Sequence, residues 1–179
     1  TSSDATYNGL NGDDITVINN DDDTAEITAV PVSGLETNEN GSTASFQVAL
    51  VTEPTNTVTV NITSTNTNEG TVSPTSLSFL TDNWNISQTV TITGQDDNAT
   101  DGNASFYIKL QGSSSDSKYD NLNGPNISVT NLDNDVPGIS VSATSGLSTT
   151  EGGGTANFTA MLNTQPSANV SLTISTSDA

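Results

Sequence analysis

Residues 43–51 read TASFQVALV, and apolar side chains fall at every second position, Ala44, Phe46, Val48 and Leu50. A period of two predicts a β-strand with one face in a core and one face in solvent. Six further segments have the same character, with clusters of Asn, Gly, Pro and Asp between them: residues 26–33, 57–65, 76–80, 88–93, 104–110 and 126–132. Seven short strands in about 110 residues predict an all-β fold, an immunoglobulin-like antiparallel β-sandwich.

The sequence repeats itself at a constant offset of 112 residues, which brings Tyr7 onto Tyr119 and keeps other rare residues in register. A period of this length is that of a whole sandwich domain, with about seven strands per 112-residue repeat. The chain therefore divides into the C-terminal strand of a preceding repeat (1–23), a complete repeat (24–135) and the N-terminal strands of a following repeat (136–179). We expect both ends to be cuts through a longer continuous chain, or to be completed by neighbouring copies in a fibre.

The composition excludes several classes of function. The chain has no cysteine and no histidine, so disulfides, thiolate sites and the usual catalytic triads are absent. Two basic residues against 21 acidic ones give a net charge of −19, which would repel nucleic acid and anionic membrane surfaces. No apolar run is long enough to cross a bilayer. We expect no nucleic-acid partner, no membrane insertion and no enzymatic activity; glycoside hydrolysis by paired carboxylates is disfavoured because the acids recur in turns between repeats.

Acidic residues gather in turns rather than in strands. The groups are Asp96, Asp97 and Asp101 after the fifth strand, Asp133 and Asp135 at the exit of the repeat, repeated as Asp21 and Asp23, and Glu39 before the second strand, repeated as Glu151. In a sandwich these three turns lie at one pole, where converging carboxylates repel one another unless a cation lies between them. An oxygen-only ligand set favours Ca²⁺ over Mg²⁺. The simpler alternative is that the acidic turns are merely solvated, and the repetition of the groups argues against it.

The same residues resemble a known family. Glu39 followed by Gly41, then the spacing Asp96-Asp97-x-x-x-Asp101, then Phe106 and finally Asp133-x-Asp135, is similar to the Calx-β domain. That family occurs in the cytoplasmic regulatory region of sodium–calcium exchangers and in long bacterial surface proteins. Residues 73–92 look like the version found in giant bacterial repeat proteins, and the resemblance extends over the complete repeat and both fragments.

The resemblance implies a seven-strand sandwich with one or more calcium ions at the pole that faces the next repeat. It implies side-chain ligands at Glu39, Asp96, Asp97, Asp101, Asp133 and Asp135, with the Ala99 carbonyl as a further candidate. The sequence departs from the family where an acid is expected after the third strand. Asn66 stands there in the complete repeat and Asp178 in the following one, which puts a second ion in doubt for the complete repeat.

We therefore expect a calcium-stabilised structural repeat, a rigid spacer or fibre module of a secreted or cell-surface bacterial protein such as an adhesin. Its partners would be adjacent repeats or neighbouring copies of the chain. An alternative is a binding module that recognises a glycan, a host protein or a surface through Thr-rich strands such as residues 57–59. A calcium sensor is a weaker alternative, since it needs a coupled effector domain. Among single residues, Trp84 is expected to cover a strand edge or to pack beside Phe79, Tyr119 to plug a loop, and Lys109 to face solvent.

Overall fold

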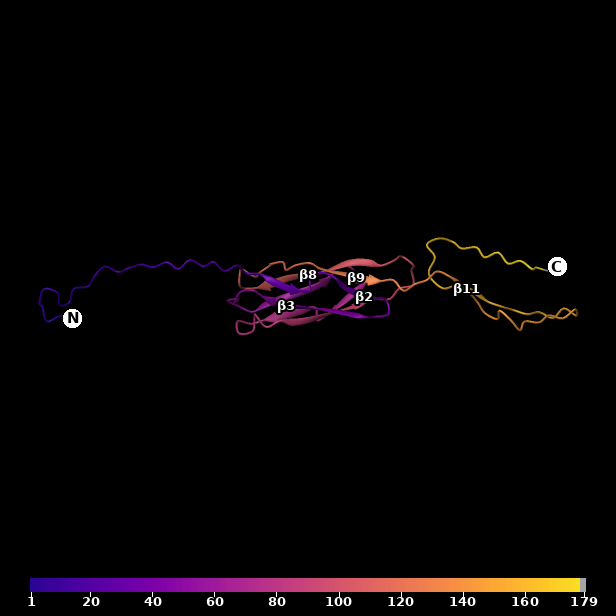
Figure 1. The fold of residues 1–179 in the computed structure, drawn as a ribbon, viewed down its shortest axis with the longest axis horizontal. Coiled ribbons are helices and arrows are strands. Elements are labelled where there is room, and N and C mark those ends of the chain that lie inside the picture. Colours follow the sequence, from indigo (N-terminus) through magenta and orange to yellow (C-terminus); the bar gives the residue numbers. More distant parts are fainter. Residues whose placement is uncertain (178–179) are drawn as a thin grey trace.

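A computed structural model describes residues 1–177 as an elongated molecule with one β-sandwich at its centre (Figure 1). The N-terminal and C-terminal segments leave this sandwich at opposite ends. Within residues 1–177, no helix has the length and apolar character needed to cross a membrane. The fold is all-β and immunoglobulin-like, as the alternation of apolar residues predicts.

Nine strands make up the sandwich, and they are β1 (Ile27–Val30), β2 (Leu35–Asn38), β3 (Thr43–Leu50), β4 (Val58–Ser64), β5 (Gly70–Ser73), β6 (Ser76–Phe79), β7 (Gln88–Gly94), β8 (Ala104–Ser114) and β9 (Ile127–Leu132). One sheet has the order β1-β3-β7-β5 and the other the order β2-β9-β8-β4-β6. A separate hairpin follows, formed by β10 (Ile139–Val141) and β11 (Ala160–Leu162). Long registers hold each sheet together, for example Val58↔Ser114 to Ser64↔Ile108 between β4 and β8.

The first predicted strand, residues 26–33, is shorter than expected, and the chain continues into a strand of the opposite sheet. It pairs as β1 with β3, passes Pro31 and then joins β9 as β2. A proline has no amide hydrogen to donate to a sheet, which favours the end of a strand at this point. The pairing of β2 with β9 is parallel, whereas the sequence predicts an all-antiparallel sandwich.

Besides β2, the sequence pattern did not predict β5. It lies next to β7 in the four-stranded sheet, and Pro74 separates it from β6 in the five-stranded sheet. Only Val72 is a large apolar residue among its four positions, so no apolar alternation marks it. Strand β8 also continues beyond the predicted residue 110 to Ser114, with Gly112 at an inward position where an alternating apolar residue is absent.

The inward faces of both sheets form one core, as the alternating sets predict. It contains Phe46, Val48 and Leu50 of β3, Val58, Val60 and Ile62 of β4, Val90 and Ile92 of β7, Phe106, Ile108 and Leu110 of β8, and Ile127 and Val129 of β9. Trp84 packs against this core and Lys109 is exposed, as expected. Tyr119 is fully buried, and its hydroxyl donates a hydrogen bond to the Thr52 carbonyl at 2.6 Å, which confirms its structural role.

Within residues 1–177, the two terminal segments form no sandwich of their own. Residues 1–26 contain no strand, and Ile15 and Val17 are 88% and 82% exposed, although the residues 112 positions later, Ile127 and Val129, are fully buried. A single strand cannot bury its apolar face without neighbours, and no counterparts of β2 and β8 lie beside this segment. The division of the chain into three repeats stays a prediction.

Candidate metal centre

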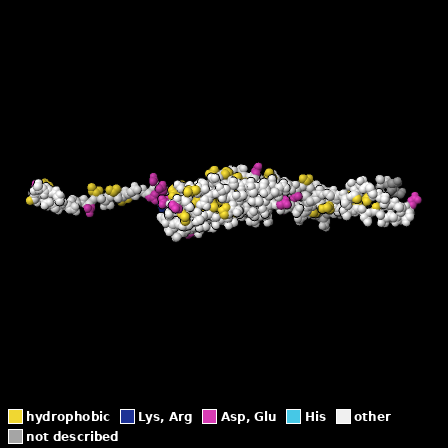
Figure 2. Space-filling model, turned by 90° about the horizontal axis from the view of Figure 1, so that it is seen from below, with side chains coloured by type: hydrophobic (Ala, Val, Ile, Leu, Met, Phe, Trp, Pro, Cys, Tyr) yellow, Lys and Arg dark blue, Asp and Glu magenta, His cyan; other side chains and the backbone are white. Residues whose placement is uncertain are grey.

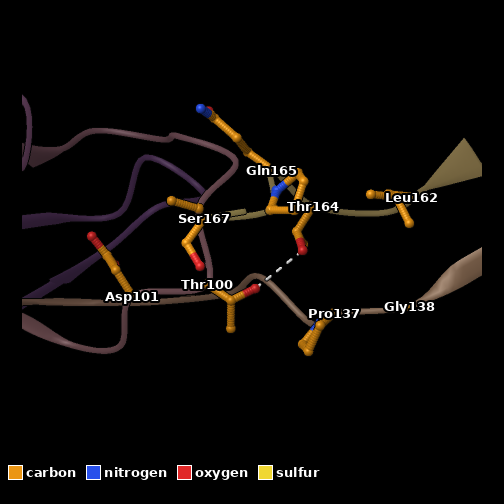
Figure 3. Close-up of a pocket in the computed structure, with 10 residues that line it drawn as sticks. Thr100, Asp101, Pro137, Gly138, Leu162, Thr164, Gln165 and Ser167 are labelled. Atoms are coloured by element: carbon orange, nitrogen blue, oxygen red, sulfur yellow. Dashed lines mark hydrogen bonds between the residues drawn. The ribbon is translucent and has the colours of Figure 1, made fainter. Parts of the chain in front are cut away.

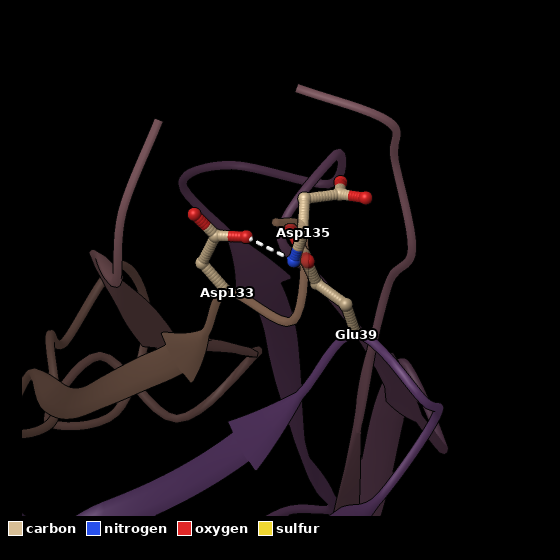
Figure 4. Close-up of side chains that lie close together, drawn as sticks. All are labelled: Glu39, Asp133 and Asp135. Atoms are coloured by element: carbon tan, nitrogen blue, oxygen red, sulfur yellow. Dashed lines mark hydrogen bonds between the residues drawn. The ribbon is translucent and has the colours of Figure 1, made fainter. Parts of the chain in front are cut away.

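The parallel pairing of β2 with β9 creates the acidic pole. Both strands run in the same direction and end side by side, with Asn38 opposite Leu132 in the register. The next residue after β2 is Glu39, and its amide donates to the Leu132 carbonyl at 3.2 Å. Glu39 therefore lies against Asp133 and Asp135, which leave β9 at the same edge, and one carboxylate oxygen of each lies within 4.8 Å of the others (Figure 4).

Backbone amides orient two of these three carboxylates, those of Glu39 and Asp133. The Asn134 amide donates to Glu39 Oε2 at 2.9 Å, and the Asp135 amide donates to Asp133 Oδ1 at 2.7 Å. The other oxygen of Asp133 accepts the Gly102 amide at 2.8 Å, which ties the exit segment to the loop before β8. The Oδ2 atom of Asp135 is buried and has no hydrogen-bond partner. A buried carboxylate oxygen without a partner is costly unless a proton or a cation satisfies it.

Burial and crowding raise the pKa of two of these acids. Glu39 is only 4% exposed, and desolvation raises its pKa above the ordinary value, with the neighbouring Asp133 and Asp97 adding to the effect and the Asn134 amide opposing it. Desolvation also raises the pKa of Asp135, with further contributions from the charges of Asp133 and the loop acids. The pole therefore holds negative charge that a cation would neutralise.

A second acidic group lies beside the first. Glu69, Asp97 and Asp101 each offer a carboxylate oxygen, all within 4.8 Å of one another. Asp97 and Asp101 belong to the predicted loop after β7, whereas Glu69 was not among the predicted ligands. Asn66 stands where an acid was expected. Its backbone carbonyl accepts the Gly70 amide at 3.1 Å and closes the turn that presents Glu69 three residues later. The signal in the sequence was that Glu69 is the only acid between Glu53 and Asp82.

A buried amide links the second group to the end of β9. Asn131 is 1% exposed, and its side-chain nitrogen donates to Glu69 Oε2 at 3.3 Å and to the Gln95 carbonyl at 3.0 Å. Its oxygen accepts the Thr37 hydroxyl at 2.9 Å. This network holds the Glu69 carboxylate from inside the sandwich, and both polar atoms of the Asn131 side chain have partners, as buried amides require.

The remaining predicted ligands have different positions. Asp96 lies at the same pole, where its Oδ1 accepts the Asn134 side-chain amide at 3.4 Å. Asp21 and Asp23 are exposed where the N-terminal segment enters the sandwich, and acidic side chains gather at this entry on the face shown in Figure 2. Asp21 forms an ion pair with Lys118, with 3.0 Å between Asp21 Oδ2 and Lys118 Nζ. Glu151 is exposed and belongs to neither acidic group, and Asp178 lies outside the described residues.

The raised pKa values predict how the cation-free protein responds to pH. Glu39 and Asp135 have ordinary pKa values of 4.5 and 3.8, and both are raised in the fold. Above about pH 4.5 the folded state therefore binds more protons than the unfolded state, so its free energy of unfolding falls as the pH rises through the raised values. Urea unfolding in chelator should show lower stability at pH 7 than at pH 5, and the opposite order would contradict the crowding of these acids.

No protein-family model matches the chain, and no curated protein matches it. Among solved structures, the apo form of the Calx CBD1 domain is 19% identical, with a TM-score of 0.47, and the match covers 63% of this chain and 100% of that one. CBD12 from CALX1.2 is 20% identical, with a TM-score of 0.46, over 62% of this chain and 44% of that one. PapD-like domain 7 of human CEP192 is 9% identical, with a TM-score of 0.47, over 71% and 98%. These likenesses concern shape only.

Proposed function

We propose that this chain is a calcium-stabilised structural repeat, a stiff spacer module of a bacterial cell-surface or secreted protein. The observation that carries the proposal is the buried, unpartnered Oδ2 of Asp135 beside the buried Glu39. Two neighbouring groups of carboxylates offer only oxygen ligands, which Ca²⁺ accepts in flexible sets of six to eight. Mg²⁺ demands near-ideal octahedral geometry and retains waters, so it fits such a set less well.

The mechanism is electrostatic and geometric. A cation at the pole would neutralise carboxylates from the turn after β2, from the loop after β7 and from the exit of β9, three segments far apart in the chain. Bound together, these segments would hold the exit residues Asp133–Asp135 against the sandwich. The chain would then leave each repeat in a defined direction, because the short link after Asp135 would have little freedom to change its orientation relative to the sandwich. A row of such repeats would behave as a rod.

The double variant Asp96→Asn, Asp97→Asn is expected to lose calcium binding. It removes two negative charges from the loop, while the asparagine side chains keep nearly the same size and shape as the aspartates. Isothermal titration calorimetry with calcium measures the effect. The control is Asp13→Asn, Asp14→Asn, which makes the same change of charge in the N-terminal segment and should bind calcium like the unchanged chain. Equal affinity of the two double variants would place the site elsewhere.

A second candidate function is recognition of a glycan or another surface by the four-stranded sheet. Small polar residues oppose one another on β3 and β7, with Thr43 opposite Thr93 and Ser45 opposite Thr91. Their side chains point away from the core and give this sheet a hydroxyl-rich face. Binding of the chain to a glycan array, retained in chelator, would favour this function over the spacer.

A further inference from the structure

The acidic loop at the pole contacts the segment that follows β11. The Gln165 amide donates to the Asn98 carbonyl at 2.7 Å, and Gln165 forms an isolated parallel bridge with Ala99. The hydroxyls of Thr100 and Thr164 are hydrogen-bonded at 3.2 Å (Figure 3). These residues are 64 to 67 positions apart in the chain, so the contact joins the central sandwich to what the repeat period identifies as the following repeat.

The loop of residues 96–101 has partners on two sides. Toward the sandwich, the Ala99 amide donates to Oδ1 of the candidate ligand Asp97 at 2.7 Å. Toward the following segment, Ala99 pairs with Gln165. A cavity of about 420 Å³ lies between the loop and the following segment, and its lining includes Asp101, Pro137 and Pro166. The part of the loop next to Asp97 is therefore held from both sides.

A segment that corresponds to residues 164–167 lies in the central sandwich itself, near the point where the N-terminal segment joins it. An offset of 112 places Thr164 and Gln165 on Thr52 and Glu53, and the pairing of Ile27 with Leu50 puts that segment beside the point where the chain enters. It is braced from inside the sandwich. Buried Tyr119 bonds to the amide, hydroxyl and carbonyl of Thr52, and buried Asp116 accepts the Thr55 amide at 2.8 Å.

We propose that this segment, residues 164–167 and equally residues 52–55, is a docking surface whose partner is the acidic loop of the preceding repeat, and that docking and cation binding strengthen each other. The proposal rests on the proposed function, because it assigns a partner to the same site. Residues 52–55 form the matching surface at the other end of the sandwich, where Lys118 already bonds to Asp21 of the incoming segment.

The coupling follows from the order that each event imposes on the loop. A cation must fix residues 96–101 to collect their carboxylates, and fixing a loop costs conformational entropy. A docked neighbour has already restricted the loop at Asn98 and Ala99, so the cation binds a partly organised site. Thermodynamic linkage makes the effect reciprocal, and a bound cation strengthens docking by the same factor. Loss of one such backbone hydrogen bond should weaken calcium binding about two- to tenfold.

The test compares Gln165→Pro with Gln165→Ala in the full chain. Proline removes the amide that donates to Asn98, whereas alanine keeps it, and the position is exposed and outside the core. Calorimetry measures calcium affinity. Spin labels on Ser45→Cys and Ser148→Cys, in a chain with no other cysteine, report whether the following segment keeps a fixed distance from the sandwich. Thr164→Val, with Thr164→Ser as its control, examines the side-chain bond to Thr100 in the same way.

The expected result is weaker calcium binding and a broader distance distribution for Gln165→Pro, with Gln165→Ala like the unchanged chain. Calcium affinity in Gln165→Pro equal to that in Gln165→Ala would overturn the coupling, whatever the distances show. A distribution as narrow in Gln165→Pro as in the unchanged chain would overturn the docking surface itself. Absence of calcium binding in the unchanged chain would instead overturn the proposed function, and the distances would still decide whether the repeats dock.

Discussion

Removal of calcium is expected to lower the melting temperature of the sandwich by about 10 °C or more. An ion that binds only the folded state adds about 2.7 kcal/mol when present at a hundred times its dissociation constant. In a domain of about 100 residues, each kcal/mol shifts the melting temperature by about 4–8 °C. Thermal unfolding in excess calcium and in excess chelator measures the difference. Coincident melting curves would contradict a structural ion at this pole.

Glu39→Gln separates the cation from other causes of that shift, because it should change stability in opposite directions in the two conditions. In chelator the variant removes a buried charge crowded by Asp133 and Asp97, so its melting temperature should rise. In calcium the variant lacks a ligand, so its melting temperature should fall below that of the unchanged chain. A fall in both conditions would mean that the charge-assisted hydrogen bond from Asn134 outweighs the repulsion between the acids.

Gly94→Ala is expected to destabilise the sandwich by about 3 kcal/mol, at the upper end of the usual cost of overpacking. A methyl group there would overlap the Asn38 carbonyl oxygen and lie 2.7 Å from Asn131 Oδ1. Asn38 belongs to β2, and Asn131 is the buried amide that holds Glu69. Asn131 is 1% exposed and Asn38 is paired with β9, so the variant should also disturb the acidic pole and weaken calcium binding.

The matched control is Gly12→Ala, since a methyl group at Gly12 meets no atom within 4 Å. Urea unfolding compares the two variants, and Gly12→Ala should match the unchanged chain. A loss of less than about 1 kcal/mol for Gly94→Ala, the low end of overpacking costs, would show that β2 is free to shift away from β7. That outcome would also remove the basis for a rigid pole.

Much of the sandwich was predictable from local pattern. Strands such as β3 and β8 alternate apolar and polar residues, and the alternation records which side chains face the core. Strand β2 has no such alternation, and its Thr37 is buried and donates a hydrogen bond to Asn131. A buried threonine cannot be told from an exposed one by its type. Short strands with few apolar residues, such as β5, leave no periodic trace.

Most of the acidic pole was also predictable, because acids in turns at matching positions of two repeats are unlike random surface charge. The structure brings Glu39 together with Asp133 and Asp135, and Asp97 together with Asp101. It adds Glu69, whose position depends on the turn begun by Asn66 and on Asn131. No spacing in the sequence records that a residue on β9 reaches a turn 62 positions earlier in the chain.

By itself, the amino-acid sequence determined the all-β class, the 112-residue period, the inward faces of the long strands and the absence of cysteine and histidine chemistry. These properties are local or compositional, so a linear pattern is sufficient to carry them. Only the tertiary structure decided that β2 crosses to the opposite sheet and runs parallel to β9. That crossing places Glu39 beside Asp133, because parallel strands that end together deliver their next residues to the same edge, and strand direction is a property of the assembled sheet.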